Sequence, residues 1–117
     1  MPGVLVFCEV KDGKLRKASR EALSIGRKLA EKAGGDLVAV AAGLDAKNAA
    51  TDAGKYGAKK LYAAASLTAY LTEPYTTLLK QVVDDVKPAI VLFGGTSNGR
   101  DVAPRLVAIY RRAISGA

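Results

Sequence analysis

Short, nearly continuous apolar runs recur along this chain of 117 residues, separated by segments with helical spacing. The runs are VLVFCEV, DLVAVAA and AIVLF, at residues 4–10, 36–42 and 89–93, with a weaker run, KLYAA, at residues 60–64. A strand buried on both faces of a parallel sheet has this continuous pattern, whereas a strand with one face in water alternates. The sequence therefore predicts four buried parallel strands.

The segment after the first run predicts a helix. It follows an Asp12-Gly13 turn, with Ser19 as the expected N-cap, and it ends at Gly34-Gly35, where glycine adopts the left-handed conformation of a C-cap. Four apolar residues at helical spacing are predicted to form its buried face: Ala22, Ile25, Leu29 and Ala33.

Two further helices are predicted before the last run. Residues 45–56 form a short Ala-rich helix closed by Gly57, and a longer helix opens at Glu73-Pro74 and stops at Pro88. The longer helix carries an apolar stripe that we interpret as core: Leu78, Leu79, Val82, Val83 and Val86.

The remaining connections are a loop at residues 66–72 and the approach to a last helix. Because Pro104 would clash inside a regular helix, that helix is predicted to begin near Asp101.

Strands that alternate with helices are joined by right-handed crossovers, which place helices on both faces of the sheet. The predicted fold class is therefore α/β, a doubly wound parallel sheet of order 3-2-1-4. The length fits one domain, residues 1–117. In such a sheet a ligand binds outside the carboxyl ends of the strands where the order reverses, so a site is expected beside the loops after Val10 and Phe93.

The loop GGTSNGRD, at residues 94–101, is the one segment with a candidate chemistry. Its backbone N–H groups and the positive end of the following helix would hold a phosphate, with Arg100 as a bidentate partner. The candidate residues are Gly94, Gly95, Thr96, Ser97, Asn98, Gly99 and Arg100. The pattern is neither a Walker A loop nor G-x-G-x-x-G. A structural alternative is that the glycines permit a tight turn and Arg100 pairs with Asp101 to fix the helix start.

The formal net charge of +7 would suit an acidic partner. Nucleic-acid binding is nevertheless not expected, because no aromatic residues that would stack bases interleave with the local basic cluster. We interpret this cluster as a solvated edge: Lys11, Lys14, Arg16, Lys17 and Arg20.

The residue inventory limits the chemistry. The absence of histidine removes the usual general base and the commonest metal ligand, so neither catalytic residues nor a metal are predicted. Cys8, the single cysteine, lies in an apolar run and suits a reducing compartment such as the cytoplasm. No apolar run approaches the about 20 residues that span a bilayer, so no membrane segment is expected.

Several segments resemble the N-terminal domain of the electron-transfer flavoprotein α subunit. They are VLVFCEVKDGKLRKAS at residues 4–19, GRKLAEKAGGDLVAV at 26–40, YGAKKLY at 56–62 and KPAIVLFGGTSNGRDVAPRL at 87–106. The last is the most specific, because its glycine-rich turn with the following GRD and APRL is typical of that family. The resemblance covers nearly the whole chain and implies an adenine-nucleotide-hydrolase-like fold.

In that family a heterodimer carries one FAD and passes electrons from dehydrogenases to a membrane quinone oxidoreductase or another acceptor. The resemblance thus implies a carrier component without an active site, with the β subunit as its partner. The family's FAD is held mainly by the C-terminal domain of the α subunit and its AMP by the β subunit. Since this sequence lacks that FAD-binding part, no cofactor is expected in this chain alone.

The family domain continues into further strands, so we expect this chain to be a fragment, a truncated product or a split subunit. Its fourth strand would then have an open edge, which predicts self-association or a partner that supplies a strand. The main alternative is a stand-alone adenine-nucleotide-binding domain that uses residues 94–100, and a nucleic-acid-binding domain ranks last.

Overall fold

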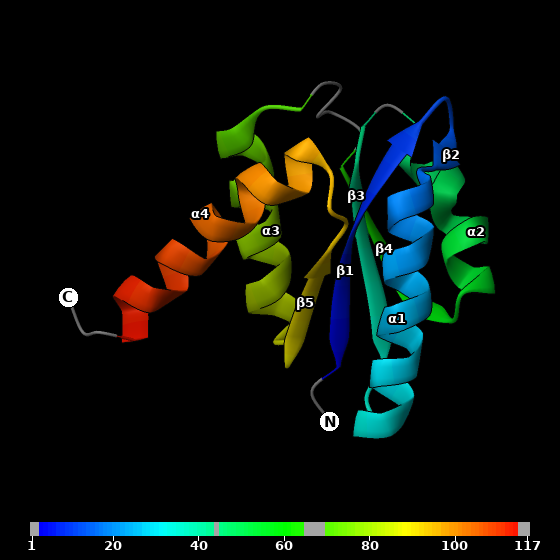
Figure 1. Cartoon of the computed structure of the whole chain (residues 1–117), viewed down its shortest axis with the longest axis horizontal. Helices are drawn as coiled ribbons and strands as arrows, with labels where there is room; N and C mark the ends of the chain where they lie inside the picture. The colour runs from blue at the N-terminus through cyan, green and yellow to red at the C-terminus, as the bar shows by residue number, and fades with distance from the viewer. Residues whose placement is uncertain (1–2, 44, 65–69, 115–117) are drawn as a thin grey trace.

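The computed structural model describes residues 3–43, 45–64 and 70–114, and its centre is a parallel sheet (Figure 1). The parallel strands are β1 (Val4–Lys11), β3 (Leu37–Ala42), β4 (Ala58–Ala64) and β5 (Ile90–Phe93). Their order is β4-β3-β1-β5, which confirms the order 3-2-1-4 predicted from the sequence.

Helices cover both faces of the sheet (Figure 1). One face is covered by α1 (Lys17–Ala33), the 3₁₀ helix η1 (Ala46–Ala49) and α2 (Ala50–Lys55). The other is covered by α3 (Thr72–Val86) and α4 (Ser97–Ile114). The doubly wound α/β class is therefore confirmed. Within the described residues, no helix is both long and apolar enough to cross a membrane.

The central strand β1 explains the continuous apolar pattern. Val4 and Val6 pack in the core under α1 and α2, whereas Leu5 and Phe7 pack in the core under α3 and α4. Because both faces of the strand are covered, apolar residues are needed at every position rather than at alternate ones.

A short antiparallel strand, β2 (Lys14–Leu15), follows β1 and was not predicted. The Asp12-Gly13 turn that joins them has φ of 53° and 75°. Positive φ at both central residues defines the type I′ turn that two-residue hairpins favour. The sequence thus predicted the turn but not the hairpin that it forms.

One prediction for α1 was wrong and another was only partly right. Ser19 is not its N-cap: the helix begins at Lys17, and the Ser19 hydroxyl, 2% exposed, accepts a hydrogen bond from the Glu9 backbone N–H at 2.7 Å. Of the predicted buried face, Ala22 is buried and Leu29 packs against the core, but Ile25 is 54% exposed and Ala33 is exposed. Gly26 turns inward instead, because it lacks a Cβ and lets the helix lie close to the sheet: an added Cβ would lie 2.9 Å from Leu37 Cδ1.

The start of α4 was also predicted wrongly. The helix begins at Ser97 rather than near Asp101, because the Thr96 hydroxyl caps it by accepting the Gly99 N–H at 3.1 Å. Pro104 lies inside the helix on an exposed position. It removes one intrahelical hydrogen bond, to the carbonyl of Arg100, without ending the helix.

The remaining boundaries are close to those expected. Pro74 lies in the first turn of α3, and β4 begins at Ala58, two residues before the predicted start. Most of the predicted loop at 66–72 lies outside the described residues.

Candidate functional site

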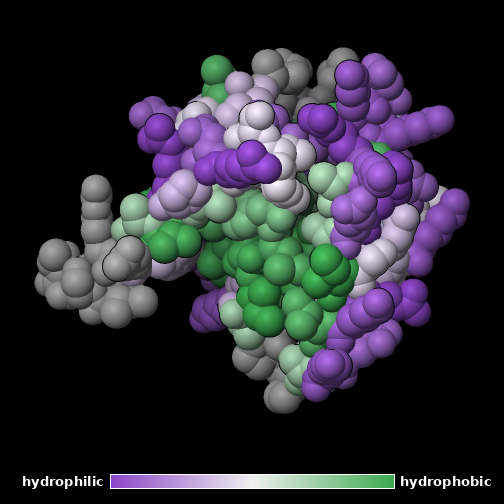
Figure 2. Space-filling view, viewed as in Figure 1, coloured by the Kyte–Doolittle hydropathy of each residue, from purple (hydrophilic) through white to green (hydrophobic). Residues whose placement is uncertain are grey.

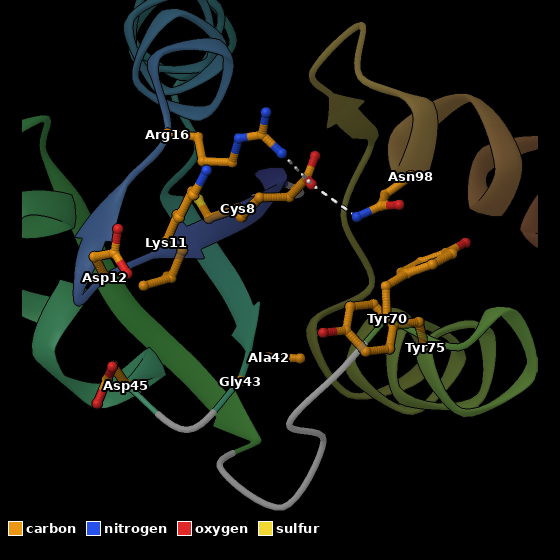
Figure 3. A pocket seen from close by; sticks show the side chains of 12 residues that line it. Cys8, Lys11, Asp12, Arg16, Ala42, Gly43, Asp45, Tyr70, Tyr75 and Asn98 are labelled. Carbon is orange, nitrogen blue, oxygen red and sulfur yellow. Dashed lines mark hydrogen bonds and ion pairs between the residues drawn. The ribbon is translucent and has the colours of Figure 1, made fainter.

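A cavity of about 350 Å³ lies at the carboxyl ends of the central strands (Figure 3). Its wall includes Cys8 and Glu9 of β1, Ala42 of β3, and Asn98 of α4. Tyr70 and Tyr75 also contribute to it. The cavity adjoins the point between β1 and β5 where the strand order reverses, since Asn98 belongs to the helix that follows β5, and a ligand is expected near that point in this class of sheet.

The carboxylate of Glu9 joins β1 to the beginning of α4. One of its oxygens accepts a hydrogen bond from the Thr96 hydroxyl. The other accepts a hydrogen bond from the Asn98 side-chain amide at 3.0 Å. The guanidinium of Arg16 lies 3.6 Å from the second oxygen. Glu9 is only 8% exposed, so these partners compensate a charge that is largely removed from water.

The backbone of Glu9 is held as firmly as its side chain. Its N–H donates to the Ser19 hydroxyl of α1, and its carbonyl accepts the Arg16 N–H at 2.9 Å. Glu9 therefore connects β1, the first turn of α1 and the start of α4.

The seven candidate residues of the predicted phosphate loop lie across the entry to α4. Asn98 lines the cavity, whereas Ser97 and Arg100 are exposed in the first helical turn. Gly94 and Gly99 serve close packing: a Cβ at Gly94 would lie 2.9 Å from Ala18 Cβ, and one at Gly99 would lie 2.3 Å from the Gly94 carbonyl oxygen. Phosphate binding by this loop stays a prediction.

Asp101 forms a second polar link between α4 and α3. Its carboxylate accepts hydrogen bonds from the hydroxyl groups of Tyr70 at 2.7 Å and Thr72 at 2.5 Å. It also lies 3.7 Å from the guanidinium of Arg105. These hydrogen bonds, with that from Thr72 the stronger cause, lower the pKa of Asp101. The local pair expected with Arg100 is thus replaced by an ion pair with Arg105.

Cys8 contributes little reactivity to the cavity wall. It is buried as the sequence predicted, and burial raises the pKa of its thiol to about 12. A thiol with so high a pKa is almost entirely protonated near neutral pH and is a poor nucleophile. Among the residues that the structure describes, no cluster of three or more His, Cys, Asp or Glu side chains could hold a metal ion.

Sequence analysis missed the central residue of this site, Glu9. A signal was present, since Glu9 is a carboxylate inside an otherwise apolar strand, near its carboxyl end. Charged residues are seldom buried unless they are paired. Tyr70 and Thr72 gave no such signal, because they flank a segment that carries no strong periodicity.

The fold is that of universal stress proteins, which are adenine-nucleotide-hydrolase-type α/β proteins. A universal stress protein from Archaeoglobus fulgidus matches with a TM-score of 0.63 and 15% identity, over 90% of this chain and 87% of that one. A universal stress protein solved with cAMP matches with a TM-score of 0.53 and 17% identity, over 92% and 91% of the two chains.

Sequence comparison identifies the family within that fold. The electron transfer flavoprotein domain model matches residues 4–112, and the chain belongs to this family. The α subunit of the electron transfer flavoprotein from Clostridium acetobutylicum is 39% identical over 108 residues, which are 91% of this chain and 32% of that protein. The acryloyl-CoA reductase electron transfer subunit beta of Anaerotignum propionicum is 39% identical over 107 residues, 90% of this chain and 29% of that protein. The chain thus spans about a third of the length of these curated relatives.

Proposed function

We propose that this chain is the N-terminal platform domain of an electron-transfer flavoprotein α subunit. In this role it supports electron transfer from dehydrogenases to an acceptor, through FAD held by other parts of the complex. The observation that carries the proposal is the family match over residues 4–112, in a chain that spans about a third of its relatives. The β subunit is the proposed partner, and the cytoplasm is the proposed location.

The chemistry of the cavity is consistent with a structural role. The Glu9 carboxylate is fully engaged by side chains of the same domain, and the Cys8 thiol is protonated and buried. Neither group is placed to act as a base or a nucleophile.

The edge strand β5 is the proposed contact with another polypeptide. All four of its residues are partly exposed, whereas residues 4–9 of β1 are buried. Within the described residues, β1 is the only strand that pairs with β5. Hydrophobic residues gather on the face between α4 and α1, where β5 lies (Figure 2). An unpaired apolar edge favours addition of a strand, either from a partner or from a second copy of this chain.

Purification from the native source tests both parts of the proposal. The absorbance spectrum and the masses of the native and denatured sample are compared. A flavin band together with a second, co-purifying chain supports a working part of a flavoprotein. A colourless sample of this chain alone would mean an isolated platform domain and would reopen the nucleotide-binding alternative, and a strictly monomeric, well-folded chain at high concentration contradicts the open edge.

The alternative function is adenine-nucleotide binding by residues 94–100. Its support is the cavity at the strand ends and the fold shared with a universal stress protein solved with cAMP. Titration with ATP and AMP tests it. Binding by the native chain that is lost in Arg100→Ala favours the alternative, and absence of binding by the native chain counts against it.

A further inference from the structure

The buried carboxylate of Glu9 lies where this fold would place the anion of a ligand. The cavity lies at the carboxyl ends of β1 and β3, next to the reversal point of the strand order and to the N-terminus of α4. The first turn of a helix offers N–H groups without intrahelical partners and the positive end of the helix dipole. An anion is favoured there, and the Glu9 carboxylate, bound to Thr96 and Asn98, already supplies one.

The donors around this position are directed at Glu9. The Thr96 hydroxyl accepts the Gly99 N–H and therefore turns its own proton toward the Glu9 carboxylate. The Asn98 amide donates to the other carboxylate oxygen, and Arg16 adds its charge from the opposite side of the cavity. A hydroxyl, an amide and a guanidinium are the groups that a bound phosphate would use.

Glu9 is also fixed in this place by the fold. Its N–H and carbonyl are both bonded to the segment that begins α1, and in the sheet it pairs with Ala42 of β3. The carboxylate is thus a permanent part of the cavity wall. The partners that link β1, α1 and α4 through Glu9 are all groups of this chain.

We propose that Glu9 is a built-in counter-anion that excludes phosphate from this cavity. Two anions a few ångströms apart in a partly buried place repel each other strongly, so a phosphate cannot share the donors with the carboxylate. The domain keeps a nucleotide-binding type of fold, but one glutamate closes it to phosphate ligands. This role goes beyond the platform function, which by itself requires no selection against nucleotides.

The test compares the native chain with Glu9→Ser, which removes the charge and the bulk, and Glu9→Gln, which removes only the charge. Inorganic phosphate and AMP are the probes, measured by calorimetric titration and by the shift of the thermal unfolding midpoint. The native chain is expected to bind neither. Glu9→Ser is expected to bind phosphate at least about tenfold more tightly than the native chain, with a smaller gain for Glu9→Gln. Only the two Glu9 variants should gain thermal stability from phosphate.

The matched control is Glu31→Gln, which makes the same change in net charge at an exposed ion pair on α1. It is expected to gain no phosphate binding. AMP binding more tightly than phosphate to Glu9→Ser would mean that the opened cavity accepts the nucleoside too, and equal affinities would mean that only the phosphate is bound. Either result supports the proposal.

Two results would overturn it. One is phosphate binding by the native chain as tight as by Glu9→Ser. The other is a folded Glu9→Gln or Glu9→Ser, judged by circular dichroism, that binds phosphate no better than Glu31→Gln. The flavin and partner measurements on the native protein do not depend on either result, so failure here is distinguishable from failure of the platform function.

Discussion

The two long helices α1 and α4 are attached to the same sheet in different ways. Beyond the Ser19–Glu9 hydrogen bond in its first turn, α1 meets the sheet through close apolar contact: Leu23 is fully buried, and Gly26 lets the helix approach β1 and β3. α4 also buries Val102 and Leu106, but its position is set by polar links. These links join Thr96 and Asn98 to Glu9, Asp101 to the start of α3, and Tyr110 to Asp84.

The difference bears on the candidate site, which lies where the start of α4 and the start of α1 both approach Glu9. Apolar burial supplies most of the favourable free energy but has no direction, so it fixes a helix only approximately. Hydrogen bonds require particular distances and angles. The polar links therefore fix the position of the first turn of α4 relative to β1 and to α1 (Figure 1).

The largest expected effect is the loss of apolar packing under α1. Leu23→Ala should lower the free energy of unfolding by about 2–5 kcal/mol, because it leaves a cavity in the core. Leu106→Ala should cost less, since Leu106 retains slight exposure on a helix whose C-terminal end extends away from the sheet (Figure 1). Urea denaturation measures both. An equal or larger loss for Leu106→Ala would contradict the contrast between the helices.

A smaller loss is expected from crowding the start of α4. Gly99→Ala would bring a Cβ within 2.3 Å of the Gly94 carbonyl oxygen, a backbone atom that cannot turn aside. The expected cost is about 1–3 kcal/mol, although alanine is normally the better helix former. Gly54→Ala in α2 is the matched control, because a Cβ there has no neighbour within 4 Å. It should stabilise by about 0.5–1 kcal/mol in thermal or urea unfolding, and equal signs for the two variants would refute the steric explanation.

The link through Asp101 predicts a small, pH-dependent effect. Hydrogen bonds from Thr72 and Tyr70 lower the folded pKa of Asp101 below its ordinary value of 3.8. The stabilisation is therefore present above that value and is lost as the pH falls through the lower, folded pKa. Asp101→Asn should lower the unfolding temperature near neutral pH, and the difference from the native chain should shrink in acid. A difference that stays constant or grows in acid would show that the carboxylate charge is not the cause.

The smallest effect concerns Cys8, which lies on the α1 side of the sheet. Burial raises the pKa of its thiol to about 12, so a thiol reagent should label it only when the domain unfolds. Glu9→Ser should be labelled no faster than it unfolds. Leu23→Ala should be labelled faster than the native chain, because it weakens the packing under α1. Mass spectrometry of timed samples measures the rates, and rapid labelling of the native chain would mean that α1 opens locally.

Much of the fold was predictable because its signals are local. Continuous apolar runs indicated strands covered on both faces, and their alternation with helical segments indicated the parallel, doubly wound order. The Asp12-Gly13 pair predicted a turn that the positive φ values bear out. The start of α4 and the buried face of α1 were not predictable in this way, since a capping hydroxyl and an inward glycine depend on what the helix packs against.

The sequence by itself determined the four parallel strands, their order and the family to which the chain belongs. Only the tertiary structure decided the partners of Glu9, because Thr96 and Asn98 lie 87 and 89 positions further along the chain. Local propensities act over a few residues, whereas the meeting of β1 with α4 depends on strand register and helix placement across the whole sheet. A buried carboxylate is tolerated where donors converge, and that convergence is a property of the folded chain.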